Sequence, residues 1–240
     1  MSEGRPAAPS DPLEILGDEG ARRLRAVVDL LAGDDRAPTT VRDRDEGWRT
    51  HVLDSLSGLC VPELAAARRI ADVGAGAGFP GIALAAALRG AHLDLIEATA
   101  RKCEFIRSAL ERAGIANAAV VCERAETWAQ TPPPAGGRES YQAVTARAVG
   151  RLSTLAELAS PLLRDGGTLV AWKGRRDPGE EIEAQRAEAR LGMVAGSVLE
   201  IGAFAGFEHR HLHVFEKRGP TPEGLPRRPG MARKRPFGDG

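Results

Sequence analysis

The sequence has few aromatic residues, few cysteines and no long apolar run. Aromatic residues make up 4% of its 240 residues, and none of the three cysteines, Cys60, Cys103 and Cys122, belongs to a C-x-x-C pair. This argues against a disulfide framework and a zinc site, so we expect reduced, structural thiols. Apolar runs such as residues 81–88 are too short to cross a bilayer, and residues 1–12 do not resemble a signal peptide. We therefore expect a cytoplasmic protein with no membrane partner.

Net charge is also lacking, because 33 Lys and Arg residues balance 33 Asp and Glu residues. This balance argues against nonspecific binding of nucleic acid by the whole surface. The charges are unevenly distributed, however, since the stretch from residue 216 onward holds seven basic and three acidic residues. We predict that this stretch contacts phosphate groups. The overall composition, 42% hydrophobic and 28% charged, is that of a soluble globular protein of one ordinary domain with short additions.

Helical periodicity dominates the first quarter of the chain. Residues 10–12 form a helix start, and apolar residues then recur at helical spacing as far as Gly33. A second helical stretch extends over residues 48–59 and is limited by Pro62. We predict a disordered tail at 1–10 and an N-terminal helical cap at 11–64.

From Arg69 onward, short β-prone runs alternate with helical segments, a pattern typical of βαβ units. We predict an α/β, Rossmann-like domain at 65–218, with a seven-stranded, mostly parallel sheet, followed by a basic C-terminal tail at 219–240. The strands are expected near 69–73, 92–96, 118–122, 141–146, 167–172, 194–200 and 209–216. The helices are expected near 80–89, 101–113, 152–163 and 179–190.

A glycine-rich run, Asp72-Val73-Gly74-Ala75-Gly76-Ala77-Gly78-Phe79-Pro80-Gly81, joins the first predicted strand to a helix. Glycines allow positive φ and a close approach of the backbone to a ligand, and open amides at a helix start favour a negative group. A purely steric need for glycine in a tight turn is the alternative. Three alternating glycines in a strand, turn and helix favour the cofactor site, so Gly74, Gly76 and Gly78 are candidate ligands.

Glu97 ends the next predicted strand, 19 residues after Gly78. An acidic side chain at this spacing reaches the ribose hydroxyls of an adenosine cofactor in doubly wound folds. The glycines also satisfy the dinucleotide pattern G-x-G-x-x-G, so a nicotinamide cofactor stays open. S-adenosylmethionine is favoured because Asp72, which can orient the turn or meet the methionine ammonium, would repel a pyrophosphate. Glu123 and Glu126 can also read adenine, and no residue set for hydride transfer is evident.

Several motifs in order resemble the RsmG (GidB) family of 16S ribosomal RNA guanine-N7 methyltransferases over residues 35–237. Apart from the turn, they are Asp54-Ser55-Leu56, Arg101-Lys102-Cys103-Glu104-Phe105, Arg124-Ala125-Glu126, Thr145-Ala146-Arg147-Ala148, Lys173-Gly174 and Pro226-Arg227-Arg228-Pro229-Gly230. Residues 37–39, Ala-Pro-Thr, depart from the family's N-L-T, and the first ten residues look like an addition. The resemblance implies that S-adenosylmethionine contacts Gly74, Phe79, Ala125, Glu126 and Arg147. Asp72, Gly76, Gly78 and Glu97 join this set from the reasoning above.

The resemblance implies methyl transfer from S-adenosylmethionine to N7 of a guanine in the decoding region of 16S rRNA, by a monomer acting on that RNA or on the 30S particle. N7 bears no proton at neutral pH, so no catalytic acid or base is expected. Arg147 is expected to position the cofactor, base or phosphate, with a salt bridge at the strand end as the alternative. The expected RNA contacts are Lys173, Arg175, Arg176, Arg227, Arg228, Arg233, Lys234 and Arg235.

Two histidine patterns allow more than one reading. His209, His211 and His213 alternate as on one face of a strand, but no carboxylate is fixed nearby by spacing, and we expect no metal site. His51 lies near Asp54 in the helical cap, where capping or packing and a contact with substrate are both open. The alternative functions are a methyltransferase with another RNA, protein or small-molecule acceptor, an NAD-dependent oxidoreductase, and a cofactor-binding regulator without catalysis.

Overall fold

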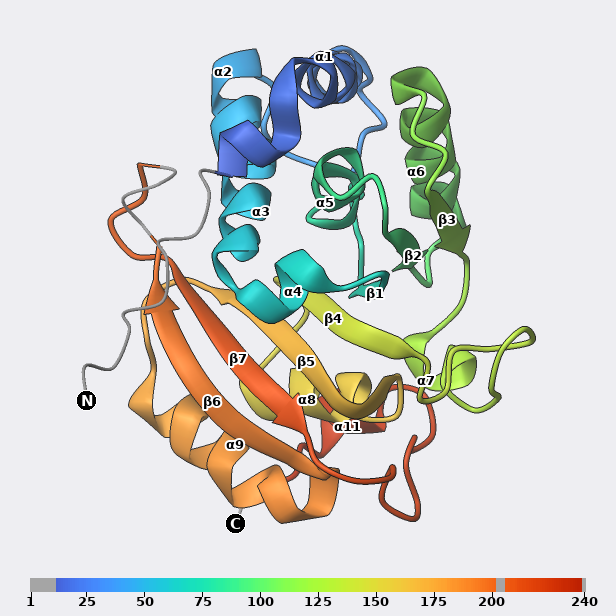
Figure 1. Ribbon diagram of the computed structural model, residues 1–240, viewed down its shortest axis with the longest axis vertical. Helices are drawn as coiled ribbons and strands as arrows, with labels where there is room; N and C mark the ends of the chain where they lie inside the picture. The colour runs from blue at the N-terminus through green and yellow to red at the C-terminus, as the bar shows by residue number, and fades with distance from the viewer. Residues whose placement is uncertain (1–11, 202–205, 239–240) are drawn as a thin grey trace, which may run out of the picture.

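The computed structural model describes residues 12–201 and 206–238 and is built on a seven-stranded sheet of order β3-β2-β1-β4-β5-β7-β6 (Figure 1). Strands β1 to β5 pair in parallel, whereas β7 runs antiparallel to both β5 and β6. The predicted α/β fold with a mostly parallel sheet is confirmed. The strands are β1 Arg69–Val73, β2 His92–Ile96, β3 Ala118–Val121, β4 Tyr141–Arg147, β5 Leu163–Lys173, β6 Met193–Glu200 and β7 His211–Lys217.

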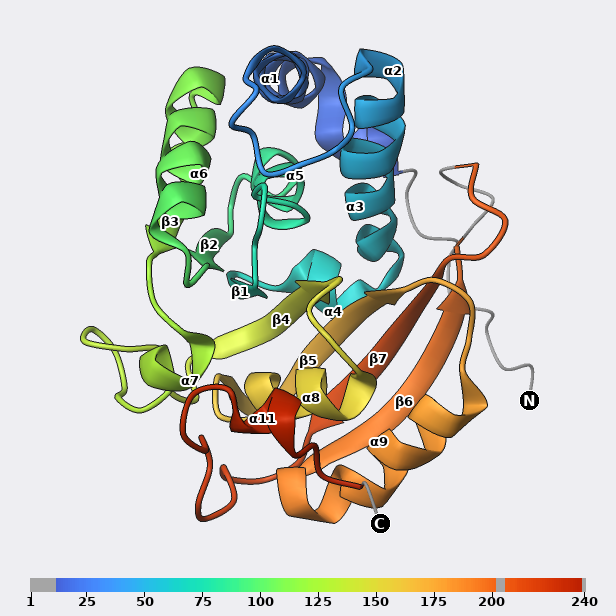
Figure 2. The ribbon, with the colours of Figure 1, turned by 180° about the vertical axis from the view of Figure 1, so that it is seen from behind.

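Helices cover both faces of this sheet, because the side chains of each buried strand point alternately to either side. Helices α1 (Pro12–Gly33), α5 (Gly81–Ala87) and α6 (Ala100–Ala113) lie on one face, and α8 (Leu152–Ala159), α9 (Pro178–Leu191) and α11 (Met231–Lys234) on the other (Figures 1 and 2). Each face has its own apolar core. Residues such as Leu93 and Val170 belong to the core under α5, whereas Val144 and Leu169 belong to the core under α8.

The N-terminal helices share the core under α5, and α1 packs against α5 and α6. Helix α1 contains a break at Gly17, whose φ is 63°. The single helix expected over 48–59 is instead a series of short turns of different pitch, and Pro62 opens the last of them at a position where its missing N–H is harmless. In order these are α2 (Arg44–Gly47), the π-helix η1 (Trp48–Leu53), α3 (Asp54–Leu56), the 3-10 helix η2 (Ser57–Cys60) and α4 (Pro62–Ala66).

The predicted end of helix α8 and the predicted start of strand β5 are wrong. The helix expected over 152–163 ends at Ala159, because Pro161 has no N–H to continue the helical hydrogen bonds. Strand β5 begins at Leu163, four residues before the expected 167, since a bulge with Gly166 at φ 70° lets the chain pair with β4 earlier. The short helix α7 (Ala125–Trp128) was not expected. The predicted tail at 1–10 lies outside the described residues.

The segment expected to be a basic tail folds back against α8 over its described residues, 219–238 (Figure 2). Leu225 and Ala232 are buried, and the Thr154 hydroxyl donates to the Ala232 carbonyl at 3.1 Å.

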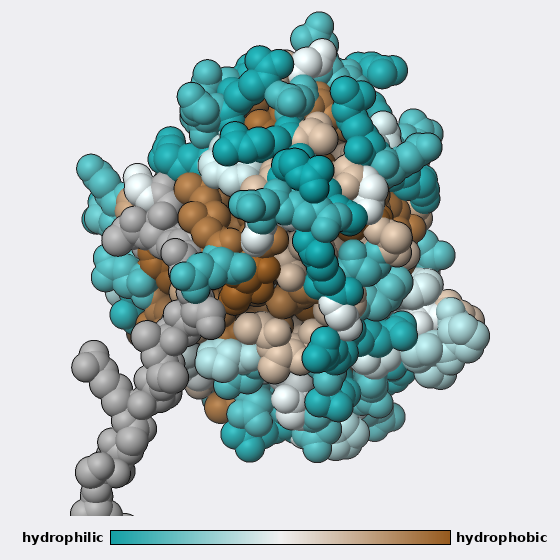
Figure 3. Space-filling view, turned by 45° about the horizontal axis from the view of Figure 1, so that its top comes forward, coloured by the Kyte–Doolittle hydropathy of each residue, from teal (hydrophilic) through white to brown (hydrophobic). Residues whose placement is uncertain are grey.

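Hydrophilic side chains cover most of the face of the molecule shown in Figure 3, with apolar residues visible between them. Among the described residues, no helix has the length and apolar character needed to cross a membrane.

Candidate cofactor and base site

The glycine-rich turn between β1 and α5 has a conformation that depends on glycine and is fixed by backbone hydrogen bonds. Gly74, Gly76 and Gly78 have φ values of 70°, 60° and 95°, a region that disfavours other residues. The amides of Gly74 and Ala75 donate to the Ile96 carbonyl at 2.9 and 3.1 Å, which ties the turn to the end of β2. A Cβ on Gly74 would lie 2.6 Å from a Val149 methyl carbon, so this position admits only glycine.

Glu97 stands at the end of β2 with its carboxylate against this turn. Its Oε2 accepts from the Gly76 amide at 3.1 Å and its Oε1 from the Thr99 amide at 2.8 Å. The residue is 7% exposed and lines a cavity of about 340 Å³ together with Gly74. The cavity lies at the carboxyl ends of β1 to β4, where doubly wound sheets bind their ligands. Two amides hold the carboxylate in place and leave further lone pairs for a ligand's hydroxyl groups.

Asp72 lies behind the turn and not in the cavity. It is fully buried, and its oxygens accept from the Gly81 amide and the Thr145 hydroxyl, both at 2.9 Å. Burial raises the pKa of this carboxyl to about 6, against the opposing effect of the two hydrogen bonds. Of the two roles considered for Asp72, the geometry matches orientation of the turn.

The wall opposite the turn comes from the segment after β3. Ala125 and Glu126 line the cavity at the start of α7. The Glu126 carboxylate, 7% exposed, accepts from the Gly230 amide at 2.7 Å, which draws the C-terminal segment to the cavity. Arg233, on α11, reaches the same cavity. The C-terminal segment is thus part of the wall of the site.

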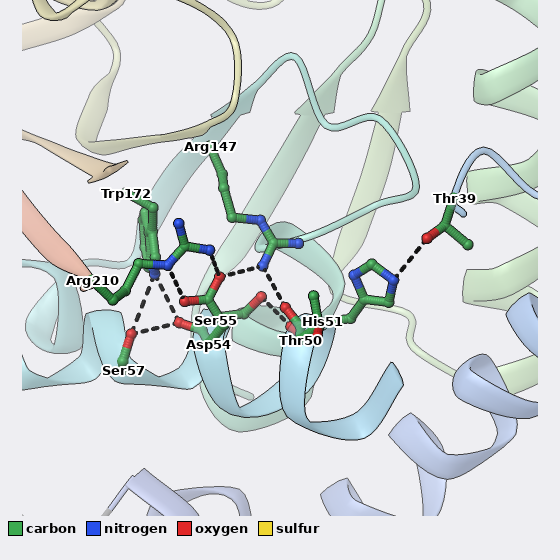
Figure 4. A network of polar contacts seen from close by, with 9 residues as sticks. All are labelled: Thr39, Thr50, His51, Asp54, Ser55, Ser57, Arg147, Trp172 and Arg210. Atoms are coloured by element: carbon green, nitrogen blue, oxygen red, sulfur yellow. Dashed lines mark hydrogen bonds and ion pairs between the residues drawn. The ribbon is translucent and has the colours of Figure 1, made fainter. Parts of the chain in front are cut away.

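A network of charged groups lies at the end of β4 (Figure 4). Arg147 Nη1 donates to Asp54 Oδ2 at 2.7 Å and to the Thr50 carbonyl at 3.0 Å, and Arg210 Nε donates to Asp54 Oδ1 at 2.6 Å. Trp172 donates its indole N–H to the Asp54 carbonyl at 2.8 Å. Burial lowers the pKa of the Arg147 guanidinium, and the Asp54 carboxylate opposes this shift. Two guanidinium groups against one carboxylate leave this network with an excess of positive charge.

A second cavity, of about 410 Å³, opens beside this network and is lined by His51, Arg147, Trp172, Lys173 and Arg210, among others. Ala148, which follows β4 with φ at 58°, lines both this cavity and the one beside Glu97. The two cavities therefore share one lining residue, in the turn after β4. Phe79 is 4% exposed and stacks on His51, with ring centroids 5.2 Å apart, which ties the glycine-rich turn to the second cavity.

The residues expected to contact RNA fall into two groups. In the first, Lys173 is paired with Glu180 at 2.7 Å and Arg227 with Glu157 at 2.6 Å, so their charges are compensated within the protein. Arg176 similarly pairs with Glu181. In the second, the side chains are exposed to solvent: Arg175, which contacts His209, and Arg228, Arg233, Lys234 and Arg235.

Sequence reasoning missed Arg210 and did not give Asp54 a role. Arg210 lies just before β7, between His209 and His211, which were considered as possible metal ligands. Its partner Asp54 is 156 residues away in the sequence. The predicted strand 209–216 begins at His211, so His209 lies outside it and the three histidines do not share one strand. His211 Nδ1 lies 2.9 Å from the Gly174 carbonyl, and no group in the described ranges is suited to hold a metal ion.

The sheet order, with β7 antiparallel between β5 and β6, is that of S-adenosylmethionine-dependent methyltransferases, and the glycine turn and the acid at the end of β2 fit this class. Solved structures share this fold. A methyltransferase of this class from Aquifex aeolicus has a TM-score of 0.52 at 18% identity, covering 72% of this chain and 94% of that one. Cofactor-bound Rv0187 from MTB has a TM-score of 0.55 at 21% identity, covering 90% and 99%.

Sequence relatives identify the family. The family model GidB, described as rRNA small subunit methyltransferase G, matches residues 26–212. The Ribosomal RNA small subunit methyltransferase G of Rubrobacter xylanophilus is 42% identical, over 95% of this chain and 89% of its own length. That of Chloroflexus aggregans is 40% identical, over 90% of both. The chain belongs to the rRNA small subunit methyltransferase G family, which decides the choice of cofactor in favour of S-adenosylmethionine.

Proposed function

We propose that this protein transfers a methyl group from S-adenosylmethionine to N7 of a guanine in the decoding region of 16S rRNA. The observation that carries the proposal is the pair of cavities that share Ala148 as a lining residue. One has the glycine turn and the Glu97 carboxylate suited to an adenosine ligand. The other has the size and positive charge suited to a nucleotide. The junction is where a methyl group would pass between the two.

Methyl transfer to guanine N7 does not require the protein to transfer a proton. S-adenosylmethionine supplies an electrophilic methyl group on a sulfonium. Guanine N7 carries an in-plane lone pair and no proton, so the N7–C bond forms as the S–C bond breaks, without a general base. The protein contributes by holding N7 in line and excluding water, effects that together reach about 7–11 kcal/mol at best. Ala148, which lines both cavities, and Arg147, which lines the second, are placed to fix this alignment.

N7 lies in the deep, narrow groove of an RNA helix, where side chains do not reach it. The target guanine is therefore unpaired or extruded from its stack when it enters the second cavity. The exposed cations Arg228, Arg233, Lys234 and Arg235 lie along the C-terminal segment that borders the cofactor cavity. We propose that they bind the phosphates that flank the target guanine. Lys173 and Arg227 are paired with carboxylates of the protein and stabilise its fold.

The proposal is tested by incubating the protein with labelled S-adenosylmethionine and 30S particles from a strain that lacks this gene. Borohydride reduction and aniline cleavage then locate 7-methylguanosine. A single cleavage in 16S rRNA is expected. Label in a different RNA or at a different atom would contradict the acceptor, and no label in 30S particles or in naked 16S rRNA would reject the function.

Changing Arg233, Lys234 and Arg235 together to glutamine is expected to weaken RNA binding and to flatten its dependence on salt. Removing one cation from a phosphate reduces the slope of log affinity against log salt by about 0.7–0.9, so the slope should fall by about 2–3. Filter binding of 30S particles at several salt concentrations measures it. A matched control changes Arg22, Arg107 and Arg112, three exposed cations on α1 and α6, to glutamine. Equal slopes for both variants would contradict the assignment.

A further inference from the structure

His51 carries a buried polar atom that the protein leaves unused. The residue is 8% exposed, and its Nδ1 has no hydrogen-bond partner. Its other nitrogen, Nε2, lies 3.0 Å from the Thr39 hydroxyl. In Figure 4 the Nε2 edge faces Thr39, while the Nδ1 edge faces the side where Arg147 lies. The residue lines the 410 Å³ cavity, so the unsatisfied nitrogen is buried next to the proposed base site. A buried polar atom without a partner is costly, and a ligand that completes it repays that cost.

Thr39 is suited to holding the His51 ring with its proton on Nδ1. The Thr39 hydroxyl oxygen accepts from the Val41 amide at 3.1 Å and keeps its O–H and a second lone pair for Nε2. When the hydroxyl donates to Nε2, the ring proton lies on Nδ1. Burial and the nearby Arg147 lower the pKa of His51 to about 4, so the ring is neutral at physiological pH. In this tautomer the side chain has one neutral N–H donor, buried beside the cavity.

An N7 methyltransferase has to distinguish guanine from adenine, since both bases have an N7. The difference on that edge is the neighbouring group, which is the O6 acceptor in guanine and the N6 amino donor in adenine. We propose that His51 selects guanine by donating its Nδ1–H to O6 of the base in the cavity. Adenine would place one donor against another. This inference rests on the proposed function and names the residue that reads the base.

A neutral donor suits this reaction better than the guanidinium groups nearby. Arginine typically binds guanine through O6 and N7 together, which would occupy the lone pair that must attack the methyl group. Methylation also leaves the base positively charged, so a cation facing O6 would oppose the reaction. Arg147 and Arg210 are instead bonded to Asp54. His51 offers a single N–H without charge, and N7 stays free.

Contact with a base requires the His51 ring to tilt toward the cavity, because its Nδ1 is buried. The ring stacks on Phe79 with an interplanar angle of 24°, so it is held on one side by the glycine-rich turn. Phe79 thus links the element that binds the cofactor to the residue that reads the base. Thr39 contacts the opposite edge of the ring at Nε2.

Paired variants separate a donor role from a packing role. Asparagine places its amide nitrogen near the position of Nδ1, whereas glutamine reaches the position of Nε2. We expect His51→Gln and His51→Leu to lower the single-turnover rate on unmethylated 30S particles by about tenfold to a hundredfold. His51→Asn should stay within a few-fold of wild type. The affinity for S-adenosylhomocysteine, measured by calorimetry, should change little in all three. Equal losses for asparagine and glutamine would overturn the proposal.

A modified substrate provides a readout that packing does not affect. The acceptor guanosine in a reconstituted 30S particle is replaced by 2-aminopurine ribonucleoside, which keeps N7 but lacks O6. Wild type should lose about as much rate as His51→Leu loses on guanosine, and His51→Leu should lose little more. If wild type methylates both bases at equal rates, or if the two losses add, His51 does not read O6. Wild-type methylation of natural 30S particles reports separately on the proposed function.

Discussion

Replacing Asp54 with asparagine is expected to lower the free energy of unfolding by about 3–5 kcal/mol, the typical cost of breaking a buried ion pair by removing one partner. Asp54 is fully buried and binds both Arg147 and Arg210. Without its charge, two guanidinium groups would face each other in a partly buried site without the carboxylate that they share. Urea denaturation at neutral pH, with and without S-adenosylhomocysteine, measures the loss.

The matched control is Asp29→Asn, which also removes one carboxylate paired with an arginine. Asp29 and its partner Arg44 are 52% and 68% exposed, so solvent screens the pair and a change of less than about 1 kcal/mol is expected. A loss at Asp54 no larger than the loss at Asp29 would show that solvent already compensates Arg147 and Arg210. The stability of this site would then come from packing around Trp172 and not from the ion pairs.

The proximity of the glycine turn and Glu97, the proposed cofactor half of the site, could be predicted because these parts are close in the sequence. Three alternating glycines and an acid one strand later sit in a single βαβ unit, where chain geometry brings the turn and the next strand end together. The structure places Gly76 and Glu97 in direct contact, 21 residues apart. Local order in the chain therefore carried this part of the prediction, together with the alternation of strands and helices.

The contacts around the proposed base cavity could not be predicted from the sequence in the same way. Arg210 binds Asp54 across 156 residues, and Trp172 binds the same residue's backbone across 118. Contacts of this kind depend on how β5 and β7 are placed beside η1 and α3, and no periodicity or spacing encodes that placement. The π-helical turn η1, which carries Thr50 and His51, was likewise expected to be an ordinary helix.

Charge counting along the C-terminus could not separate paired from exposed basic residues, for a related reason. The sequence treats Arg227 and Arg233 alike, yet Arg227 is locked onto Glu157 while Arg233 is exposed at the mouth of the cofactor cavity. Glu126 and Gly230 belong to two short motifs that were recognised separately, and only the fold joins them, 104 residues apart. A count of basic residues measures charge, but it does not show which side chains are free to bind RNA.

Glu97→Ala is expected to weaken binding of S-adenosylhomocysteine by about 10- to 150-fold, the equivalent of about 1.5–3 kcal/mol for hydrogen bonds to a charged group. The carboxylate has two tasks, since it accepts from the Gly76 and Thr99 amides and faces the cavity. Alanine removes both. Glutamine keeps one acceptor oxygen, so Glu97→Gln should bind with an intermediate affinity. Isothermal titration calorimetry gives the dissociation constants, and thermal midpoints show whether the fold is retained.

The control for this effect is Glu104→Gln, which removes an exposed carboxylate from α6, outside the cofactor cavity. Its affinity for S-adenosylhomocysteine should match that of wild type. Should Glu97→Ala bind as tightly as Glu104→Gln, the carboxylate would serve only to brace the turn, and the adenosine would be held by the backbone of residues 74–76 and by the wall at Ala125. A loss shared equally by Glu97→Ala and Glu97→Gln would instead mean that the negative charge itself, more than the turn geometry, holds the ligand.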